Sequence, residues 1–217
     1  MAAAKGSPLG QDTLGEIYEL GVGGAPQDYD QARNLFGKAA EQNYASAQTD
    51  EGDLYLWGWG TEEDPNRAKE LYEKAANKDD SMAQNNLGYL YFIGKGATKD
   101  YTQARDWSEK SAKQGNPLAQ ELLGVIYRKG LGVDVNAKQA FRCFMAAAEQ
   151  GRVPSMVVLG DMLRGGEGTP QNPAEAFRWY CKAAEQASGK AKSEAKSRLA
   201  ETDGSCLPSP APVAESR

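Results

Sequence analysis

The chain has 217 residues and a formal net charge of -5, with 40% hydrophobic and 25% charged residues. This composition is that of a folded globular or repeat protein rather than a disordered or fibrous one. The acidic balance argues against a nucleic-acid-binding protein, which needs clustered Lys and Arg, and no apolar run is long enough for membrane insertion.

A repeat of 36 residues organises the sequence. One alanine recurs at this spacing, at Ala32, Ala68, Ala104, Ala140 and Ala176. Four residues before it comes an acid or its amide, at Asp28, Asp64, Asp100, Asn136 and Asn172. A glycine recurs at nearly the same spacing, at Gly15, Gly52, Gly88, Gly124 and Gly160. Self-similarity at a fixed period of this size predicts an array of five stacked repeats.

Each copy predicts two helices. In the third copy Ala83, Leu87, Leu90 and Tyr91 fall on one face of a first helix. A glycine pair follows the first helix in every copy, at Gly21 and Gly23, Gly58 and Gly60, Gly94 and Gly96, Gly130 and Gly132, and Gly166 and Gly168. The first glycine of each pair suits a left-handed helix end. The second helix then begins at the recurring Asp or Asn, whose side chain can accept a hydrogen bond from an unpaired N–H.

The ends of the array differ from its interior. Residues 1–8 form an N-terminal segment, and residues 9–187 hold the five repeats. Residues 188–202 predict a polar-backed capping helix, because the last repeat of an array must cover its apolar face. Residues 203–217 are rich in Ser and Pro and predict a disordered tail.

These residues resemble the Sel1-like repeat family, which is related to the tetratricopeptide repeats. The third copy carries the family pattern as Leu87-Gly88, Tyr91, Gly94, Gly96 and Ala104, with Trp107, Ser111-Ala112 and Gly115 following. The resemblance implies an all-α fold, a right-handed α-solenoid of five helix-turn-helix repeats plus a C-terminal capping helix. It also implies a non-enzymatic adaptor or scaffold that binds a protein or peptide in a concave groove lined by the first helices.

The family resemblance leaves the specific role open. A narrower possibility is a bacterial immunity or effector-neutralising protein, since relatives of similar size block toxins. One alternative is a cell-wall-fragment binding protein or hydrolase of the cysteine-rich Sel1-like type. Those relatives carry a cysteine pair in each repeat, whereas this chain has only Cys143, Cys181 and Cys206. The other alternative is a structural spacer in a larger assembly.

No catalytic, cofactor-binding or metal-binding residue is expected. The chain has no histidine, the commonest general base, and its cysteines lack zinc-ligand spacing. The glycine pairs follow helices, whereas phosphate-binding loops follow strands. The acidic runs Glu62-Glu63-Asp64 and Asp79-Asp80 stand at helix boundaries, where capping or solvated acids explain them better than a calcium site or an acid pair.

The predicted binding surface consists of first-helix residues that point away from the packing face. They are Asp12, Glu16, Glu19, Asp53, Trp57, Asn85, Tyr89, Phe92, Val125, Arg128, Lys129 and Arg164. Along the array they change from acidic through aromatic to partly basic. Trp57, Tyr89 and Phe92 are the expected anchors, because aromatic side chains dominate interface hot spots.

A competing interpretation is that these three aromatic side chains fill gaps between adjacent repeats. Trp59 lies between two glycines, in the place of Val22 and Leu131, and is expected to be a packing residue.

The opening residues 1–8 contain no apolar segment of the kind that directs secretion. A cytoplasmic location is therefore expected. A periplasmic or secreted location is the alternative if a signal peptide has been removed.

Overall fold

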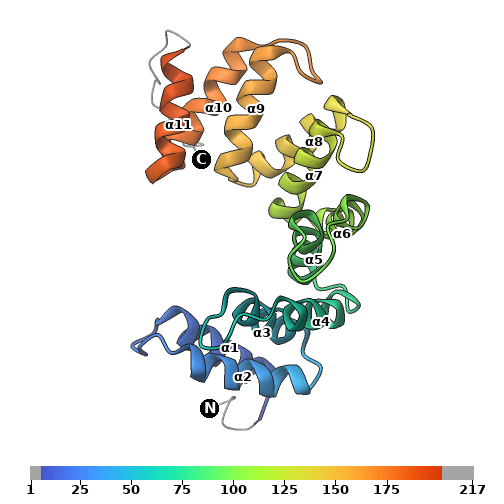
Figure 1. Cartoon of the computed structure of the whole chain (residues 1–217). Coiled ribbons are helices and arrows are strands. Elements are labelled where there is room, and N and C mark those ends of the chain that lie inside the picture. The colour runs from blue at the N-terminus through green and yellow to red at the C-terminus, as the bar shows by residue number, and fades with distance from the viewer. Residues whose placement is uncertain (1–5, 202–217) are drawn as a thin grey trace, which may run out of the picture. The chain divides into compact units, whose positions relative to one another are not determined.

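The computed structural model describes residues 6–201, which contain eleven helices and no strand (Figure 1). The expected all-α fold of five helix pairs and one closing helix is confirmed. The chain divides into two compact units, Met1–Val135 and Asn136–Arg217. The tail predicted at 203–217 lies outside the described residues.

The first unit holds seven helices and the second holds four. In the first unit they are α1 (Pro8–Leu20), α2 (Tyr29–Glu41), α3 (Ala45–Trp57), α4 (Pro65–Ala76), α5 (Ser81–Ile93), α6 (Tyr101–Lys113) and α7 (Pro117–Lys129). In the second unit they are α8 (Ala137–Glu149), α9 (Val153–Gly165), α10 (Pro173–Gln186) and α11 (Gly189–Ala200). Odd-numbered helices from α1 to α9 are the first helices of the repeats. Within the described chain, none of the helices has the length and apolar character to cross a membrane.

Acidic side chains cap the helices as the sequence predicts. The Asp64 carboxylate accepts a hydrogen bond from the Arg67 N–H at 3.0 Å, at the start of α4. The Asp80 carboxylate accepts one from the Ala83 N–H at 2.8 Å, at the start of α5. Each bond satisfies one of the N–H groups that a helix start leaves unpaired.

In repeats one, two and five, the recurring glycine of the first helix lies where the second helix of the same repeat presses an aromatic ring against the backbone. A Cβ at Gly52 would come within 2.6 Å of the Tyr72 ring, which is closer than real Cβ atoms approach. The same contact joins Gly15 to Phe36 and Gly160 to Tyr180, at 2.5 and 2.4 Å for the added Cβ. All three rings are fully buried.

From the second repeat on, the second glycine of each pair packs against the preceding repeat. A Cβ at Gly96 would lie 2.4 Å from the carbonyl oxygen of Pro65, at the start of the preceding second helix. Gly96 also has a φ of 68°, a left-handed conformation that glycine adopts readily. Close approach and backbone conformation together explain the glycine pairs without any bound phosphate.

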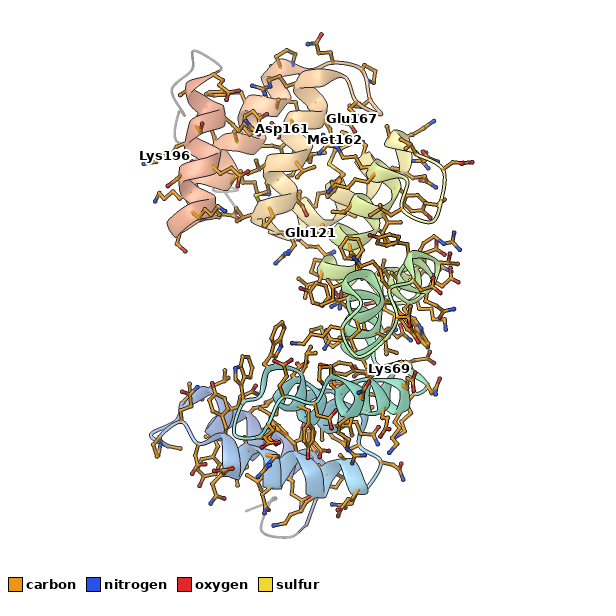
Figure 2. The ribbon with its side chains drawn as sticks, in the orientation of Figure 1. Lys69, Glu121, Asp161, Met162, Glu167 and Lys196 are labelled. Atoms are coloured by element: carbon orange, nitrogen blue, oxygen red, sulfur yellow. The ribbon has the colours of Figure 1, made fainter. Side chains whose placement is uncertain are left out.

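The closing helix α11 packs on α10 and α9 within the second unit. Ala195 on the inner face of α11 is fully buried, whereas Lys196 is exposed. Figure 2 labels Lys196 on α11 and Asp161 on α9. Arg198 of α11 forms an ion pair with Asp161 of α9, with Nε and Oδ1 3.0 Å apart. The helix therefore has the apolar inner face and polar back that a terminal cap requires.

We expect Gly52→Ala to lower the free energy of unfolding by about 1 to 3 kcal/mol, because the new methyl group would overlap the Tyr72 ring. Gly37→Ala on α2 is the matched control, since its nearest neighbour would be 3.8 Å away. Alanine favours helix over glycine, so the control should be stabilised by about 0.5 to 1 kcal/mol. Urea unfolding followed by circular dichroism measures both changes. Equal effects of the two substitutions would contradict the packing role of Gly52.

Candidate protein-binding surface

Charge is segregated between the two kinds of helix in the first three repeats. The first helices α1, α3 and α5 contain no Lys or Arg. Their acids are Asp12, Glu16, Glu19, Asp50, Glu51 and Asp53. The helical basic side chains lie on the second helices, at Arg33, Lys38, Arg67, Lys69, Lys74, Arg105, Lys110 and Lys113, while Lys78, Lys95 and Lys99 lie in the connections. The first helices therefore carry a field of one sign, which favours a positively charged ligand.

Three of these acids meet where α1 and α3 approach each other. Carboxylate oxygens of Asp12, Glu16 and Asp50 lie within 4.8 Å of one another. Asp12 is only 4% exposed, and burial raises the pKa of its carboxyl. A hydrogen bond from Ser46 lowers this pKa, and the negative charge of Glu16 raises it further. Burial and the charges of its acidic neighbours raise the pKa of Asp50 to about 9. The sequence analysis did not predict a role for Asp50, because its position is defined by contacts between helices.

Asp53 joins three helices. Its Oδ1 accepts a hydrogen bond from the Tyr72 hydroxyl of α4 at 2.5 Å and another from the Asn86 amide of α5 at 2.9 Å. Burial raises the pKa of Asp53 from 3.8 to about 6, opposed by the Tyr72 bond and assisted by the Asp80 charge. Burial and the Asp53 charge likewise raise the pKa of Glu19. Asp53 therefore acts mainly in the packing of repeats two and three.

The exposed aromatic side chains gather at and after the end of α3 and on α5. Trp57 is 46% exposed, and Trp59 and Tyr89 are each 40% exposed. Trp57 and Trp59 stack with their ring centroids 6.5 Å apart, and Trp59 stacks on Tyr29 at 5.7 Å. Trp59 thus packs on Tyr29 of the preceding repeat with one side of its ring, and the remainder of the ring faces solvent.

Lys95 holds Trp57 in place from one side. Its Nζ lies 4.9 Å from the centroid of the Trp57 ring and donates to the Leu56 carbonyl at 3.0 Å. The same Nζ is 3.2 Å from a carboxylate oxygen of Glu63. This arrangement shows that the Trp57 ring accepts a cation on its face.

Two of the predicted contact residues are less accessible. Asn85 is 7% exposed and donates its amide to the Asn86 side chain. Phe92 is half-buried and packs edge-on against Tyr101, with centroids 5.6 Å apart. These two side chains line the base of the surface rather than protrude from it. We call the exposed part the acidic–aromatic face, made of Glu16, Glu19, Trp57, Trp59 and Tyr89.

The basic residues predicted further along the chain have separate surroundings. On α7, Val125 and Arg128 are half-buried and Lys129 is exposed. Arg164 lies on α9 in the second unit, where it pairs with Glu201 at 2.5 Å and approaches Asp161 at 3.9 Å. Arg164 therefore anchors the closing segment of the second unit.

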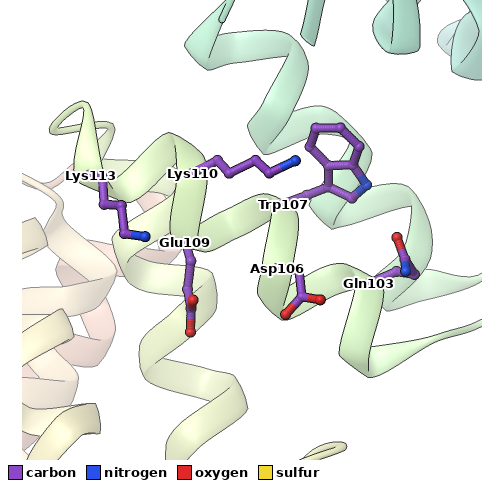
Figure 3. A pocket seen from close by; sticks show the side chains of 6 residues that line it. All are labelled: Gln103, Asp106, Trp107, Glu109, Lys110 and Lys113. Atoms are coloured by element: carbon purple, nitrogen blue, oxygen red, sulfur yellow. The ribbon is translucent and has the colours of Figure 1, made fainter. Parts of the chain in front are cut away.

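A surface hollow on α6 is a poor candidate for a ligand site. Figure 3 shows its lining, which is Gln103, Asp106, Trp107, Glu109, Lys110 and Lys113. All six side chains come from one helix, and Lys110 covers the Trp107 ring with its Nζ 3.7 Å from the centroid. Ligand pockets are usually built by several elements that enclose the ligand.

Comparison with known proteins identifies the repeats. The model of the Sel1 repeat matches residues 9–44, 45–80, 81–116, 117–151 and 153–188. A search of curated proteins found no match.

Several solved structures have the same fold. The protective antigen c5321 of uropathogenic Escherichia coli is 33% identical, with a TM-score of 0.81 over 92% of this chain and 42% of its own. The chain thus spans less than half of that protein. A Sel1 repeat protein from Oxalobacter formigenes is 29% identical, with a TM-score of 0.76 over 89% of this chain and 79% of its own. The immunity protein PA5088 of Pseudomonas aeruginosa is 23% identical, with a TM-score of 0.56 over 83% of this chain and 67% of its own, which shows a shared fold alone.

Asp53→Asn should remove a pH-dependent loss of stability. When folding raises the pKa of a carboxyl, the protonated group stabilises the folded chain fully at a pH below the pKa that it has in the unfolded chain. This stabilisation is lost as the pH rises through the pKa of the folded chain, which is about 6 for Asp53. From pH 4 to pH 7.5 the unfolding free energy of the natural chain should therefore fall by roughly 1 to 3 kcal/mol relative to the variant. Asparagine keeps the oxygen that accepts from Tyr72 and Asn86.

Urea unfolding across this pH range measures the difference. The groups that face Asp53 are Tyr72, Asn86 and the acids Asp80, Glu19 and Asp50. Asp30→Asn is the control, since that carboxylate lies exposed on α2 beside Arg33. Parallel curves for the natural chain and Asp53→Asn would contradict the prediction.

Proposed function

Because the chain belongs to the Sel1 repeat family, we propose that it is a non-enzymatic adaptor that binds a basic segment of another protein on the acidic–aromatic face. Sel1 repeat proteins mediate protein–protein interactions and are generally non-catalytic scaffolds. The proposal adds the place of binding and the chemistry of the partner.

The observation that carries the proposal is the separation of charge between first and second helices. Acids but no Lys or Arg occupy α1 and α3, and three large aromatic side chains stand exposed at and after the end of α3 and on α5. Tyr and Trp are the side chains that most often dominate binding energy. Acidic groups around such anchors attract Lys and Arg and repel phosphates, which favours a basic protein segment over a nucleic acid.

Equivalent positions in successive repeats support a continuous surface within the first unit. Glu16, Asp53 and Tyr89 each follow the shared glycine of their repeat by one residue. The Asp53–Asn86 hydrogen bond links α3 to α5, and the Asp12, Glu16 and Asp50 contact links α1 to α3. A bound segment could therefore contact acids on α1 and aromatic rings on α3 and α5.

Lys95 indicates how a partner side chain could be received. Its ammonium group lies against one face of Trp57, while the ring keeps 46% of its surface exposed. A second cation or an apolar side chain from the partner would cover this remaining surface. Cation–π contacts of this kind contribute about 0.5 to 2 kcal/mol each, more as water is excluded.

A narrower form of the proposal is an immunity protein that neutralises a toxin. PA5088 is such a protein by its description, and it shares the fold of this chain. Co-expression with the toxin encoded beside the gene would test this role. Rescue of growth would support it, and continued toxicity would count against it.

The double variant Trp57→Ala, Tyr89→Ala should lose about tenfold or more of partner capture, because it removes two of the predicted anchors while leaving the helix core intact. A tagged chain of residues 1–217 would be used to enrich proteins from the native lysate, with mass spectrometry as the readout. Added salt should weaken capture by the natural chain, since charges screen one another at high ionic strength. Phe92 is left in place because it packs on Tyr101.

Val135→Ala is the matched control. This side chain is 68% exposed in the loop between α7 and α8 and lies outside the acidic–aromatic face. Its capture should equal that of the natural chain, and far-UV circular dichroism should show unchanged helix in both variants. Unchanged capture by the double variant would exclude the acidic–aromatic face as the binding site.

A further inference from the structure

Two buried carboxylate oxygens face each other between α1 and α3 without hydrogen-bond partners. They are Oδ1 of Asp12 and Oδ2 of Asp50. Asp12 is 96% shielded from solvent, since only 4% of its surface is exposed. Glu16 stands one helical turn after Asp12, and one oxygen of each of the three acids lies within 4.8 Å of the others.

Carboxylate oxygens are seldom buried without a partner, because removing a charge from water is costly unless it is paired or binds a metal. No Lys or Arg of the described chain is within ion-pair distance of Asp12 or Asp50. The other charged groups that act on them are Glu19, Asp53 and Asp80, which are also acids. The cluster is therefore neutralised either by a proton, which the raised pKa of Asp50 allows, or by a cation from outside the chain.

We propose that Asp12, Glu16 and Asp50 form a binding site for a divalent cation of the calcium type. The site joins the first helix of repeat one to the first helix of repeat two. It rests on the contact between these three acids and not on partner binding, although Glu16 also belongs to the acidic–aromatic face.

The ligand set selects the class of ion. All three donors are carboxylates, which are the hard oxygen ligands that Ca²⁺ and Mg²⁺ prefer. Nitrogen and sulfur donors, which favour zinc and copper, are missing from the cluster. Ligands on opposite sides of Ca²⁺ lie about 4.6 to 5.2 Å apart, at twice the usual metal–oxygen distance, so oxygens within 4.8 Å of one another can share this ion.

The surroundings allow the ion to enter and to complete its shell. Glu16 is exposed, so one side of the cluster opens to solvent and to coordinating water. The Ser46 hydroxyl lies against Asp12 and orients that carboxylate. Asp12 at the base and Glu16 at the rim thus form a partly enclosed site, with Asp50 supplied from the second repeat.

Binding would couple the cation to the stacking of the first two repeats. A ligand that binds only the folded chain stabilises it by mass action. With α1 and α3 joined through one ion, repeat one should unfold at a higher temperature in Ca²⁺ than in its absence. The effect should disappear when a ligand from either helix is removed.

The test is calorimetric titration of Ca²⁺ into the EDTA-treated, dialysed full-length chain. We expect one saturable site with a Kd between about 10⁻⁵ and 10⁻³ M. Asp50→Asn and Glu16→Gln should each weaken binding at least about tenfold, while Asp53→Asn, on the same helix but outside the cluster, should change it less than about threefold. Saturating Ca²⁺ should raise the Tm of the natural chain by about 5 °C and leave that of Asp50→Asn unchanged.

Two results would overturn the proposal. One is the lack of saturable binding by the natural chain up to about 10 mM Ca²⁺. Even the weak calcium sites of extracellular proteins bind the ion within this range. The other is equal binding by the natural chain and both ligand variants. In either case the buried pair is neutralised by a proton, and Asp50→Asn should then stabilise the chain equally with and without the ion. Glu16→Gln keeps the test valid if Asp50→Asn fails to fold, because Glu16 is exposed.

Discussion

The contact on which the helix pairs of repeats one, two and five depend is an aromatic ring lying directly on a helix backbone. At Gly52 the Tyr72 ring occupies the space that a side chain would fill, and Gly160 and Tyr180 repeat the arrangement. A glycine costs helix stability, by about 1 kcal/mol relative to alanine. The loss is offset because the fully buried ring removes a large apolar area from water and contacts the backbone closely.

The same contact determines where acids can be buried. The Tyr72 and Tyr180 hydroxyls reach the acid one residue after the glycine and donate to Asp53 and Asp161, at 2.5 and 2.7 Å. What lies on the other side of each acid differs. Asp161 meets the Arg198 cation of the closing helix, whereas Asp53 meets the neutral Asn86 amide. The residue after the recurring glycine thus forms an ion pair in repeat five, as Asp161. In repeat two, as Asp53, it belongs to a group of acids that no basic side chain of the described residues pairs with.

The sequence predicts the fold well, and it predicts the exposure of part of the candidate surface. The period of 36 residues, the glycines and the capping acids define the helix pairs locally, so Asp64 and Asp80 cap helices as expected. Trp57 and Tyr89 are exposed as the offset from the packing face indicates. Trp59 and Asp50 could not be placed in this way. Their surroundings depend on Tyr29 of the preceding repeat and on Asp12 of α1, which no local pattern specifies.

A repeat array tolerates a cluster of like charges better than a compact domain with one core does. Its stability is approximately a sum over repeats and their nearest-neighbour interfaces, so a cost at one interface need not spread to the rest. The crowded acids of α1 and α3 lie at the first such interface, while the apolar contacts within each repeat remain. The like charges between α1 and α3 therefore weaken one interface selectively. A positive ligand bound there, whether an ion or a basic side chain, would strengthen that interface more than any other. Binding of such a ligand should for this reason raise the local stability of the first two repeats.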